Sequence, residues 1–156
     1  MNDTEIKPST LAGKYLTFNI GQESYGINVL NVQEIIRLVN ITAAPQMPRY
    51  VKGVINLRGK VIPAISTGLR LGLAELPYTE RTCIVVIHRK SIRLGLIVDG
   101  VEEVLNIGEG DIAETRETAE TPTSTFVIGT AEIKGVRKKL LNTEAFFEGL
   151  GALLHS

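Results

Sequence analysis

The side chains that could carry out catalysis are few and scattered in this sequence. The two histidines are His88, which lies next to basic residues, and His155, the penultimate residue. Aspartate occurs only at positions 3, 99 and 111, and the pair Asp99-Gly100 is typical of a turn. A nucleophile needs a base and a group that orients the base, and no stretch of the sequence offers such a set. The sequence therefore favours a binding protein over an enzyme.

Motifs for a cofactor or a metal are also missing. Gly108-Glu109-Gly110 lacks the third glycine and the preceding strand of a dinucleotide-binding loop. Glu102 and Glu103 are neighbours, and neighbours on a strand point to opposite faces, so they do not form a carboxylate pair. Cys83, the single cysteine, lies in an apolar run and is best interpreted as a small buried hydrophobe. We expect no cofactor and no metal site.

The composition limits the class of partner. Lysine plus arginine and aspartate plus glutamate number 17 each, so the net charge is zero and gives no reason to expect nucleic acid. With no tryptophan and 5% aromatic residues, stacking of single-stranded bases is also disfavoured. The N-terminus lacks the pattern of a signal peptide, and no apolar run reaches the roughly 20 residues that span a bilayer. We therefore expect a soluble cytoplasmic protein without membrane insertion.

The sequence contains an internal repeat. Gly26 matches Gly95 and Glu34 matches Glu103, and the apolar positions between them are kept. The matching segments are 25–36 with 94–105, 50–53 with 126–129, and 56–59 with 132–135. Because the segments follow in the same order, the chain is predicted to hold two copies of one unit. Each copy is too short to bury a strong core alone, so the copies should pack against each other.

Within a copy the pattern is that of strands. Leu16, Phe18 and Ile20 alternate with more polar residues, which indicates a half-buried strand. Segments 54–57 and 60–62 flank Arg58-Gly59, which predicts a hairpin with a tight turn. Short strands joined by tight turns favour an all-β fold with a small barrel per copy.

Three segments are less regular. Residues 30–36 are compatible with a turn or two of helix or with a continuing strand. Residues 144–154 place apolar side chains on one helical stripe, with Asn142 or Thr143 as the N-cap. Residues 109–125 have the composition of an exposed, mobile loop.

Several of these segments resemble the CheW family in order and spacing. They are 25–27, 32–37, 50–59, 61–63 and 94–101, and the block Gly-Val-Ile-Asn-Leu-Arg-Gly at 53–59 is highly specific. The resemblance implies two five-stranded SH3-like barrels packed together, with short helices that include a C-terminal one. On this basis we expect a flexible tail at 1–13 and a CheW-like domain at 14–156. Within the domain the first barrel should span roughly 15–66, the second roughly 82–135, and a final strand and helix 136–154.

The resemblance also implies a function. Members of the family are adaptors that couple chemoreceptors to a chemotaxis histidine kinase in signalling arrays. A surface on the first barrel should bind the regulatory domain of the kinase. A groove between the barrels should take the cytoplasmic tip of a methyl-accepting chemoreceptor. The protein should then be cytoplasmic and recruited to receptor arrays.

Two segments depart from the family pattern. After 61–63 the family usually carries a valine, an isoleucine and Asp-Leu-Arg, whereas residues 64–68 read Ala-Ile-Ser-Thr-Gly. The usual apolar final strand is replaced by Arg137-Lys138-Lys139. These changes put in question the contacts that the family makes at both places, but not the fold.

The candidate partner-binding residues follow from the resemblance and the repeat. They are Val32, Glu34, Ile35, Ile36, Asn56, Leu57, Arg58, Gly59, Val101 and Val104. We expect Glu34 and Arg58 to form an ion pair, and their repeat counterparts Glu103 and Lys134 to provide a second acid beside a base. About half of the five apolar positions in this set should belong to the core, and the rest should form exposed apolar patches.

Two other interpretations remain open. The same fold serves as a regulatory module of a kinase or as an adaptor fused to a receiver; the short N-terminal tail and the end at Ser156 favour a stand-alone adaptor. A small β-barrel enzyme or nucleic-acid binder is a more distant possibility.

Overall fold

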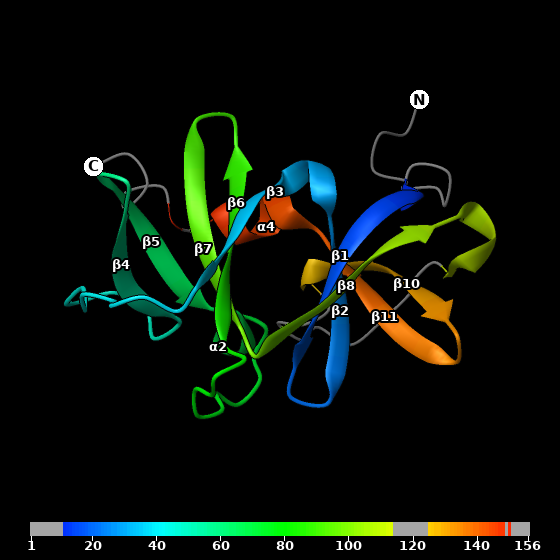
Figure 1. Ribbon diagram of the computed structural model, residues 1–156, viewed down its shortest axis with the longest axis horizontal. Coiled ribbons are helices and arrows are strands. Elements are labelled where there is room, and N and C mark those ends of the chain that lie inside the picture. Colours follow the sequence, from blue (N-terminus) through cyan, green and yellow to red (C-terminus); the bar gives the residue numbers. More distant parts are fainter. Residues whose placement is uncertain (1–10, 114–124, 149, 151–156) are drawn as a thin grey trace.

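The computed structural model describes residues 11–113, 125–148 and 150, and most of them lie in two β-sheets (Figure 1). Sheet A has the order β8-β1-β2-β11-β10-β9, and sheet B has the order β3-β6-β7-β5-β4. The strands of sheet A are β1 (Gly13–Ile20), β2 (Glu23–Asn28), β8 (Gly100–Ile107), β9 (Ile112–Ala113), β10 (Val127–Ile133) and β11 (Val136–Leu141). The strands of sheet B are β3 (Val32–Arg37), β4 (Val51–Leu57), β5 (Lys60–Ser66), β6 (Cys83–Arg89) and β7 (Ile92–Val98). The helices are η1 (Val29–Asn31), α2 (Thr67–Arg70), η2 (Glu109–Asp111) and α4 (Thr143–Phe147). The predicted all-β class with short helices is confirmed.

The sheets do not follow the two halves of the sequence. The first copy of the repeat, β1 to α2, gives β1 and β2 to sheet A but β3, β4 and β5 to sheet B. The second copy, β6 to α4, gives β6 and β7 to sheet B but β8, β9, β10 and β11 to sheet A. Each of the ranges 15–66 and 82–135 therefore contributes strands to both sheets. The physical reason is that the chain crosses from one sheet to the other after β2 and again after β7, so that each copy completes the sheet of the other.

The repeat itself is confirmed in the strand register. Both hairpins break register at the same place, between Val51 and Gly53 in one copy and between Val127 and Gly129 in the other. The parallel pairs also match, because Ala64 faces Gly95 in sheet B as Leu140 faces Gly26 in sheet A. The two copies thus have one topology and exchange equivalent strands.

One segment of chain borders both edges of each sheet. In sheet A, β8 lies at one edge, and the chain continues through η2 into β9, which pairs with β10 at the other edge. In sheet B, β3 lies at one edge and Thr42, shortly after it, bridges Val54 of β4 at the other edge. The same segment of chain thus lies at both edges of each sheet, which is the arrangement expected of a small barrel.

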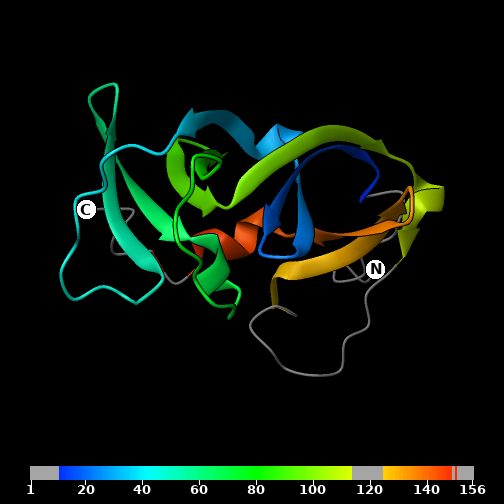
Figure 2. The same ribbon diagram turned by 60° about the horizontal axis from the view of Figure 1, so that its bottom comes forward.

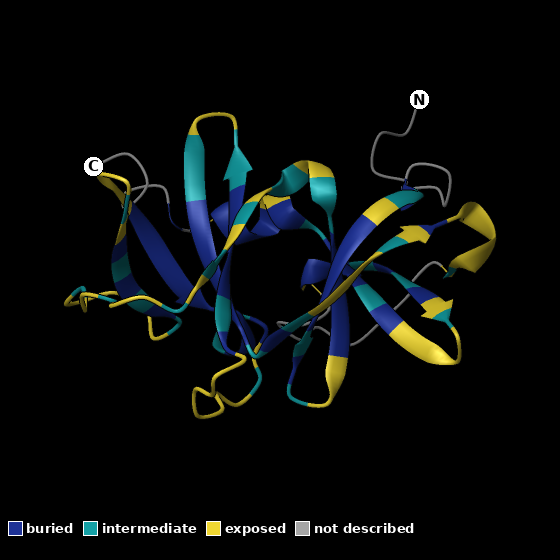
Figure 3. Ribbon diagram, in the orientation of Figure 1, coloured by how far each residue is buried: buried dark blue, intermediate teal, exposed yellow. Residues whose placement is uncertain are grey.

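The core has three parts, and the largest lies between the sheets. The interior of sheet B holds Ile55, Ile84 and their neighbours, and the interior of sheet A holds Tyr15, Leu140 and theirs. The third cluster joins Phe18 and Ile27 of sheet A to strands of sheet B and to α4, which lies between the sheets in both views (Figures 1 and 2). The facing surfaces are buried, and the exposed residues gather at hairpin ends and loops (Figure 3). The expectation that the copies pack against each other is confirmed.

The helices α2 and α4, both within the described residues, begin in equivalent places. Asn142 caps α4 by accepting from the Glu144 N–H at 3.1 Å, as predicted, and α4 ends at Phe147. Ser66 caps α2 by accepting from the Leu69 N–H at 3.2 Å. Serine is as good an N-cap as the aspartate that the family usually carries. The helix is therefore retained although residues 64–68 depart from the family pattern. Of the helix expected at 144–154, residues 149 and 151–154 lie outside the described residues.

Two segments expected to be mobile are partly ordered. Gly13 opens β1, and Leu11 is buried, with its carbonyl accepting from the Tyr15 hydroxyl at 2.6 Å. Residues 109–113 form η2 and β9. Residues 11–13 and 109–113 therefore differ from the expected tail and loop, because neither composition nor charge indicates their pairing partners. Residues 1–10 and 114–124 lie outside the described residues.

Tyr25 makes the stability sensitive to alkali. Its side chain is fully buried and its hydroxyl has no hydrogen-bond partner among the described residues. Burial, with a smaller effect of Glu23, raises the pKa of Tyr25 to about 12 from an ordinary 10.0. The unfolded phenol ionises first, so stability should be complete below pH 10 and fall as the pH rises toward about 12.

Tyr25→Phe should remove part of this alkaline loss. At neutral pH its free energy of unfolding should be unchanged or higher by about 1 kcal/mol, because a buried hydroxyl without a partner is lost. Urea unfolding at pH 7 and at several pH values above 9 would measure both effects. An unchanged alkaline profile would assign the loss to other groups.

Candidate partner-binding site

Arg58 lies at the tip of the β4–β5 hairpin. Leu57 pairs with Lys60, so Arg58 and Gly59 form the turn, with φ of 51° and 84°. The Asn56 Oδ1 accepts from the Gly59 N–H at 3.0 Å and closes the turn. Left-handed backbone is unfavourable for arginine, so this position is held by the turn and not by the preference of the residue. The predicted hairpin is confirmed.

Glu34 of β3 forms the predicted ion pair with Arg58. The Arg58 Nη2 donates to the Glu34 Oε2, and the exposed fractions of the side chains are 67% for Arg58 and 24% for Glu34. The hydrogen bond from Arg58 lowers the pKa of the Glu34 carboxyl, and the same bond raises the pKa of Arg58. Both groups are therefore charged at neutral pH. The pair fixes one end of a guanidinium that stays largely open to solvent.

The apolar candidates divide between core and surface. Val32 and Val101 are half-buried and pack against the core between the sheets, while Ile36 and Leu57 pack against the interior of sheet B. Ile35 and Val104, which are repeat counterparts, are 45% and 56% exposed. Of the five positions Val32, Ile35, Ile36, Val101 and Val104, three are thus partly buried and pack against the core, and two are exposed. The candidates do not form one patch, because Val101 and Val104 lie on β8 of sheet A and the others on sheet B.

The two most exposed large apolar side chains of the described residues were not among the candidates. Val61, which faces Asn56 across the hairpin, is 68% exposed, and Leu30 in η1 is 80% exposed. Val61 could have been predicted to be exposed, because it alternates along the strand with the buried Ile62. The exposure of Leu30 could not be predicted, because the sequence left open whether its segment was helix or strand.

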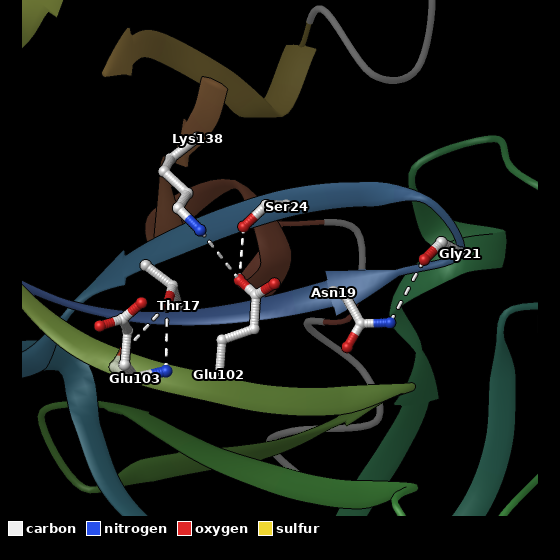
Figure 4. Close-up of polar contacts among 7 residues, drawn as sticks. All are labelled: Thr17, Asn19, Gly21, Ser24, Glu102, Glu103 and Lys138. Atoms are coloured by element: carbon white, nitrogen blue, oxygen red, sulfur yellow. Dashed lines mark hydrogen bonds and ion pairs between the residues drawn. The ribbon is translucent and has the colours of Figure 1, made fainter. Parts of the chain in front are cut away.

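The second acid–base pair differs from the expected one. Glu103 and Lys134, both described, form no ion pair with each other; instead the neighbouring Glu102 pairs with Lys138 at 3.3 Å. Glu102 also accepts from the Ser24 hydroxyl at 2.5 Å (Figure 4). The cause is a bulge in β8, where Thr17 faces Glu103 and Phe18 faces Val101, so Glu102 has no opposite residue. It is free to reach across β1 to Ser24 and Lys138.

These side chains form a polar cluster inside sheet A, made of Thr17, Ser24, Glu102 and Lys138. Thr17 is fully buried, and its hydroxyl donates to the Glu103 carbonyl at 2.9 Å. Lys138, from the second departure, is only 6% exposed. The counterparts of Thr17 and Lys138 in sheet B are the buried Val86 and Ile62. Lys138 thus places a charge in the interior of sheet A, whereas the equivalent positions of sheet B are apolar.

Glu102→Ala should lower the free energy of unfolding by about 2 kcal/mol. It leaves the Lys138 ammonium buried without its partner, and the cost is at the low end for such losses because the Glu102 side chain is 29% exposed. Glu102→Gln with Lys138→Ile, which copies Gln33 and Ile62 of sheet B, should stay within about 1 kcal/mol of the native protein. Urea unfolding measures both.

The neighbouring Glu103→Ala is the matched control and should have little effect, because the bonds between Glu103 and Thr17 use only the Glu103 backbone. A double variant that is as unstable as Glu102→Ala would show that the cluster contributes more than charge compensation.

Other chemistry is limited in the part of the chain that the structure describes. Its His, Cys, Asp and Glu residues include no group of three or more that could hold a metal ion. Burial raises the pKa of the Cys83 thiol, which makes it less reactive. None of the described helices has the length and apolar character needed to cross a bilayer.

Comparisons with known proteins agree with this architecture. A family model described as the CheW-like domain matches residues 14–150. The chain is 34% identical to "Chemotaxis protein CheW" of Rhizobium meliloti (strain 1021), over 88% of this chain and 94% of that protein. It is 38% identical to "Chemotaxis protein CheW" of Helicobacter pylori (strain ATCC 700392 / 26695), over 74% of this chain and 71% of that protein.

A solved structure is similar as well. The scaffolding protein TtCheW from Thermoanaerobacter tengcongensis superposes with a TM-score of 0.81 at 31% identity, covering 90% of this chain and 95% of that one. The exchanged two-sheet architecture, the family match over almost the whole domain and these relatives lead to one conclusion: the chain belongs to the CheW-like family of chemotaxis adaptor and scaffold proteins.

Proposed function

We propose that this chain couples a methyl-accepting chemoreceptor to a chemotaxis histidine kinase by binding both. The regulatory domain of the kinase would dock on the end of sheet B that carries Glu34, Asn56, Leu57, Arg58 and Gly59. The cytoplasmic tip of the receptor would lie where the two sheets meet. The protein would work in the cytoplasm, recruited to receptor arrays, and would perform no catalysis of its own.

The observation that carries the proposal is the state of Arg58. Its side chain is 67% exposed, yet the left-handed turn and Glu34 hold it in one place. Lys134 has the same φ of 51° at the equivalent tip of the β10–β11 hairpin but no ion pair with Glu103, so the ion pair with Glu34 distinguishes Arg58. A guanidinium with free N–H groups can then accept a carboxylate or carbonyl partner with little ordering cost.

Apolar side chains near this end support a protein partner. Ile35 on β3 and Val61 on β5 are exposed and belong to the same sheet as Arg58. An exposed arginine with scattered apolar neighbours suits a small, transient contact. The contact would gain strength from the many links of an array.

The receptor surface rests on a different set. Val32 and Val101 both touch the core between the sheets and remain partly exposed. Val32 is the first residue of β3 and Val101 the second of the equivalent strand β8, where the chain has just crossed from one sheet to the other. Leu30, which precedes Val32, is 80% exposed. An amphipathic helical tip could lay its apolar face on such residues.

The test is a binding assay with both partners. The tagged chain is incubated with purified kinase and with vesicles that contain a receptor from the same organism, and sedimentation then reports which components come down together. We expect the kinase to sediment with the receptor vesicles only when the chain is present. Sedimentation of the kinase to the same extent without the chain, or retention of neither partner by the chain, would overturn the proposal.

A further inference from the structure

The exchange of strands between the copies creates four seams. In sheet A the copies meet at β8–β1 and β2–β11, and in sheet B at β3–β6 and β5–β7. At each seam, a strand of the first copy pairs with a strand of the second copy. Nothing in these pairs requires both copies to belong to one chain. Two chains could form the same seams, with the first copy of each paired to the second copy of the other.

The segment that joins the copies has the properties of a hinge. Residues 72–81 are all exposed except the half-buried Leu73. Ser66 of β5 faces Ile97, and Cys83 of β6 faces Val98, so both ends of the segment lie at the same end of sheet B, on either side of β7. Two strand spacings separate them by about 10 Å. The segment is far longer than this gap needs, and the Lys52–Glu75 ion pair of 3.0 Å tethers it to β4.

The polar cluster allows pairing only between unlike copies. Glu102 and Lys138 come from the second copy, and Ser24 from the first, so their contacts cross both seams of sheet A. If two second copies paired, Lys138 would lie beside Arg93, the counterpart of Ser24, in a buried position. Two cations there would repel each other.

Two first copies would also pair poorly. Ser24 would then lie beside Ile62, the counterpart of Lys138, and Gln33 would stand where Glu102 accepts the hydroxyl. The buried Ser24 would lose its charged partner, at a cost in stability. The cluster therefore selects the pairing of a first copy with a second copy, within one chain or between two.

We propose that this chain binds a second copy of itself by reciprocal exchange, with residues 72–81 as the hinge. The exchanged dimer keeps all seams of the monomer and presents two Arg58 tips in one particle. The monomer prevails in dilute solution, because the hinge gives the two copies of one chain a high effective concentration. The dimer forms when chains fold together at high concentration, since exchange requires the seams to open.

The experiment uses full-length chains that carry one cysteine each. Lys14 and Asn106 are exposed and face each other across the β1–β8 seam. Lys14→Cys is placed in one chain and Asn106→Cys in another, both with Cys83→Ala. The two chains are unfolded together, refolded at high concentration and oxidised. A mixed disulfide between the two chains should form at least tenfold more than in chains that were folded separately and then mixed.

Arg37→Cys, in the same Cys83→Ala background, is the matched control. Arg37 is exposed and is the counterpart of Asn106, facing Cys83 as Asn106 faces Lys14. The Arg37→Cys chain is refolded together with the Lys14→Cys chain. A disulfide between these two chains requires that two first copies pair, so we expect no more of it than in chains that were folded separately. Equal cross-linking with Arg37→Cys and Asn106→Cys would overturn the proposal, as would no increase on refolding together.

Removing the hinge tests the same proposal without cysteines. Deletion of residues 72–81 should convert the protein into a folded dimer at all concentrations, as measured by light scattering and circular dichroism. A deletion variant that is a folded monomer, or that is unfolded at every concentration, would overturn the proposal.

Discussion

Arg58→Glu should weaken binding of the kinase regulatory domain about tenfold or more. The substitution places a second carboxylate beside Glu34, whose pKa is now held low by the Arg58 hydrogen bond. It also removes the planar donors that a partner carboxylate or carbonyl would meet. Because the Arg58 side chain is 67% exposed and its ion pair is a surface pair, the melting temperature should change little.

Adding Glu34→Arg to Arg58→Glu should restore part of the binding, since the reversed pair again fixes the hairpin tip to β3. Titration calorimetry with the purified regulatory domain measures all three proteins. Lys134→Glu is the matched control, because Lys134 has the same φ of 51° at the equivalent tip of the β10–β11 hairpin but no ion pair with Glu103. It should leave binding of the kinase domain nearly unchanged.

Three results would contradict the role given to the pair. Full affinity of Arg58→Glu would remove Arg58 from the contact. A double variant no better than the single one would mean that Arg58 acts by touching the partner directly and not through Glu34. Unfolding of Arg58→Glu would place its role in the fold.

The sequence predicted the repeat and its hairpins but not which strands the two copies exchange. The matching glycines Gly26 and Gly95 both lie close to neighbouring side chains, because a Cβ would meet Leu140 at 3.3 Å from Gly26 and Ile84 at 2.9 Å from Gly95. Alternating apolar residues show which face of a strand is buried. They do not show which strand lies beside it. In this fold β1 pairs with β2 of its own copy on one side and with β8 of the other copy on the other side.

The candidate site shows the same division. The Glu34–Arg58 pair followed from the family resemblance. The Glu102–Lys138 pair did not, because alternation along a regular strand separates Glu102 from Glu103 and gives no sign of the bulge that frees Glu102. Lysine is also rarely buried, so Lys138 was interpreted as a departure from the family pattern and not as part of the interior of a sheet.

Gly53→Ala should be the most destabilising single change, lowering the free energy of unfolding by more than about 4 kcal/mol. Gly53 has a φ of 147°, and a Cβ there would lie 2.0 Å from the Thr42 carbonyl oxygen. Thr42 and Val54 exchange two backbone hydrogen bonds of 2.9 Å, which join the segment after β3 to β4. The clash is with backbone, so the Thr42 segment must move and both bonds must break.

Gly129→Ala is the matched control from the second copy. A Cβ at Gly129 would meet the end of the Leu11 side chain at 3.0 Å and the Ala113 carbonyl only at 3.6 Å. A side chain can move where backbone cannot, so the loss should be about 1 kcal/mol. Urea unfolding of both variants measures the difference in the free energy of unfolding. Equal losses would show that the bridge between Thr42 and Val54 contributes little to stability. Because β4 continues from Gly53 into the turn that carries Arg58, a folded remnant of Gly53→Ala should also bind the kinase domain weakly, whereas Gly129→Ala should bind it as the native protein does.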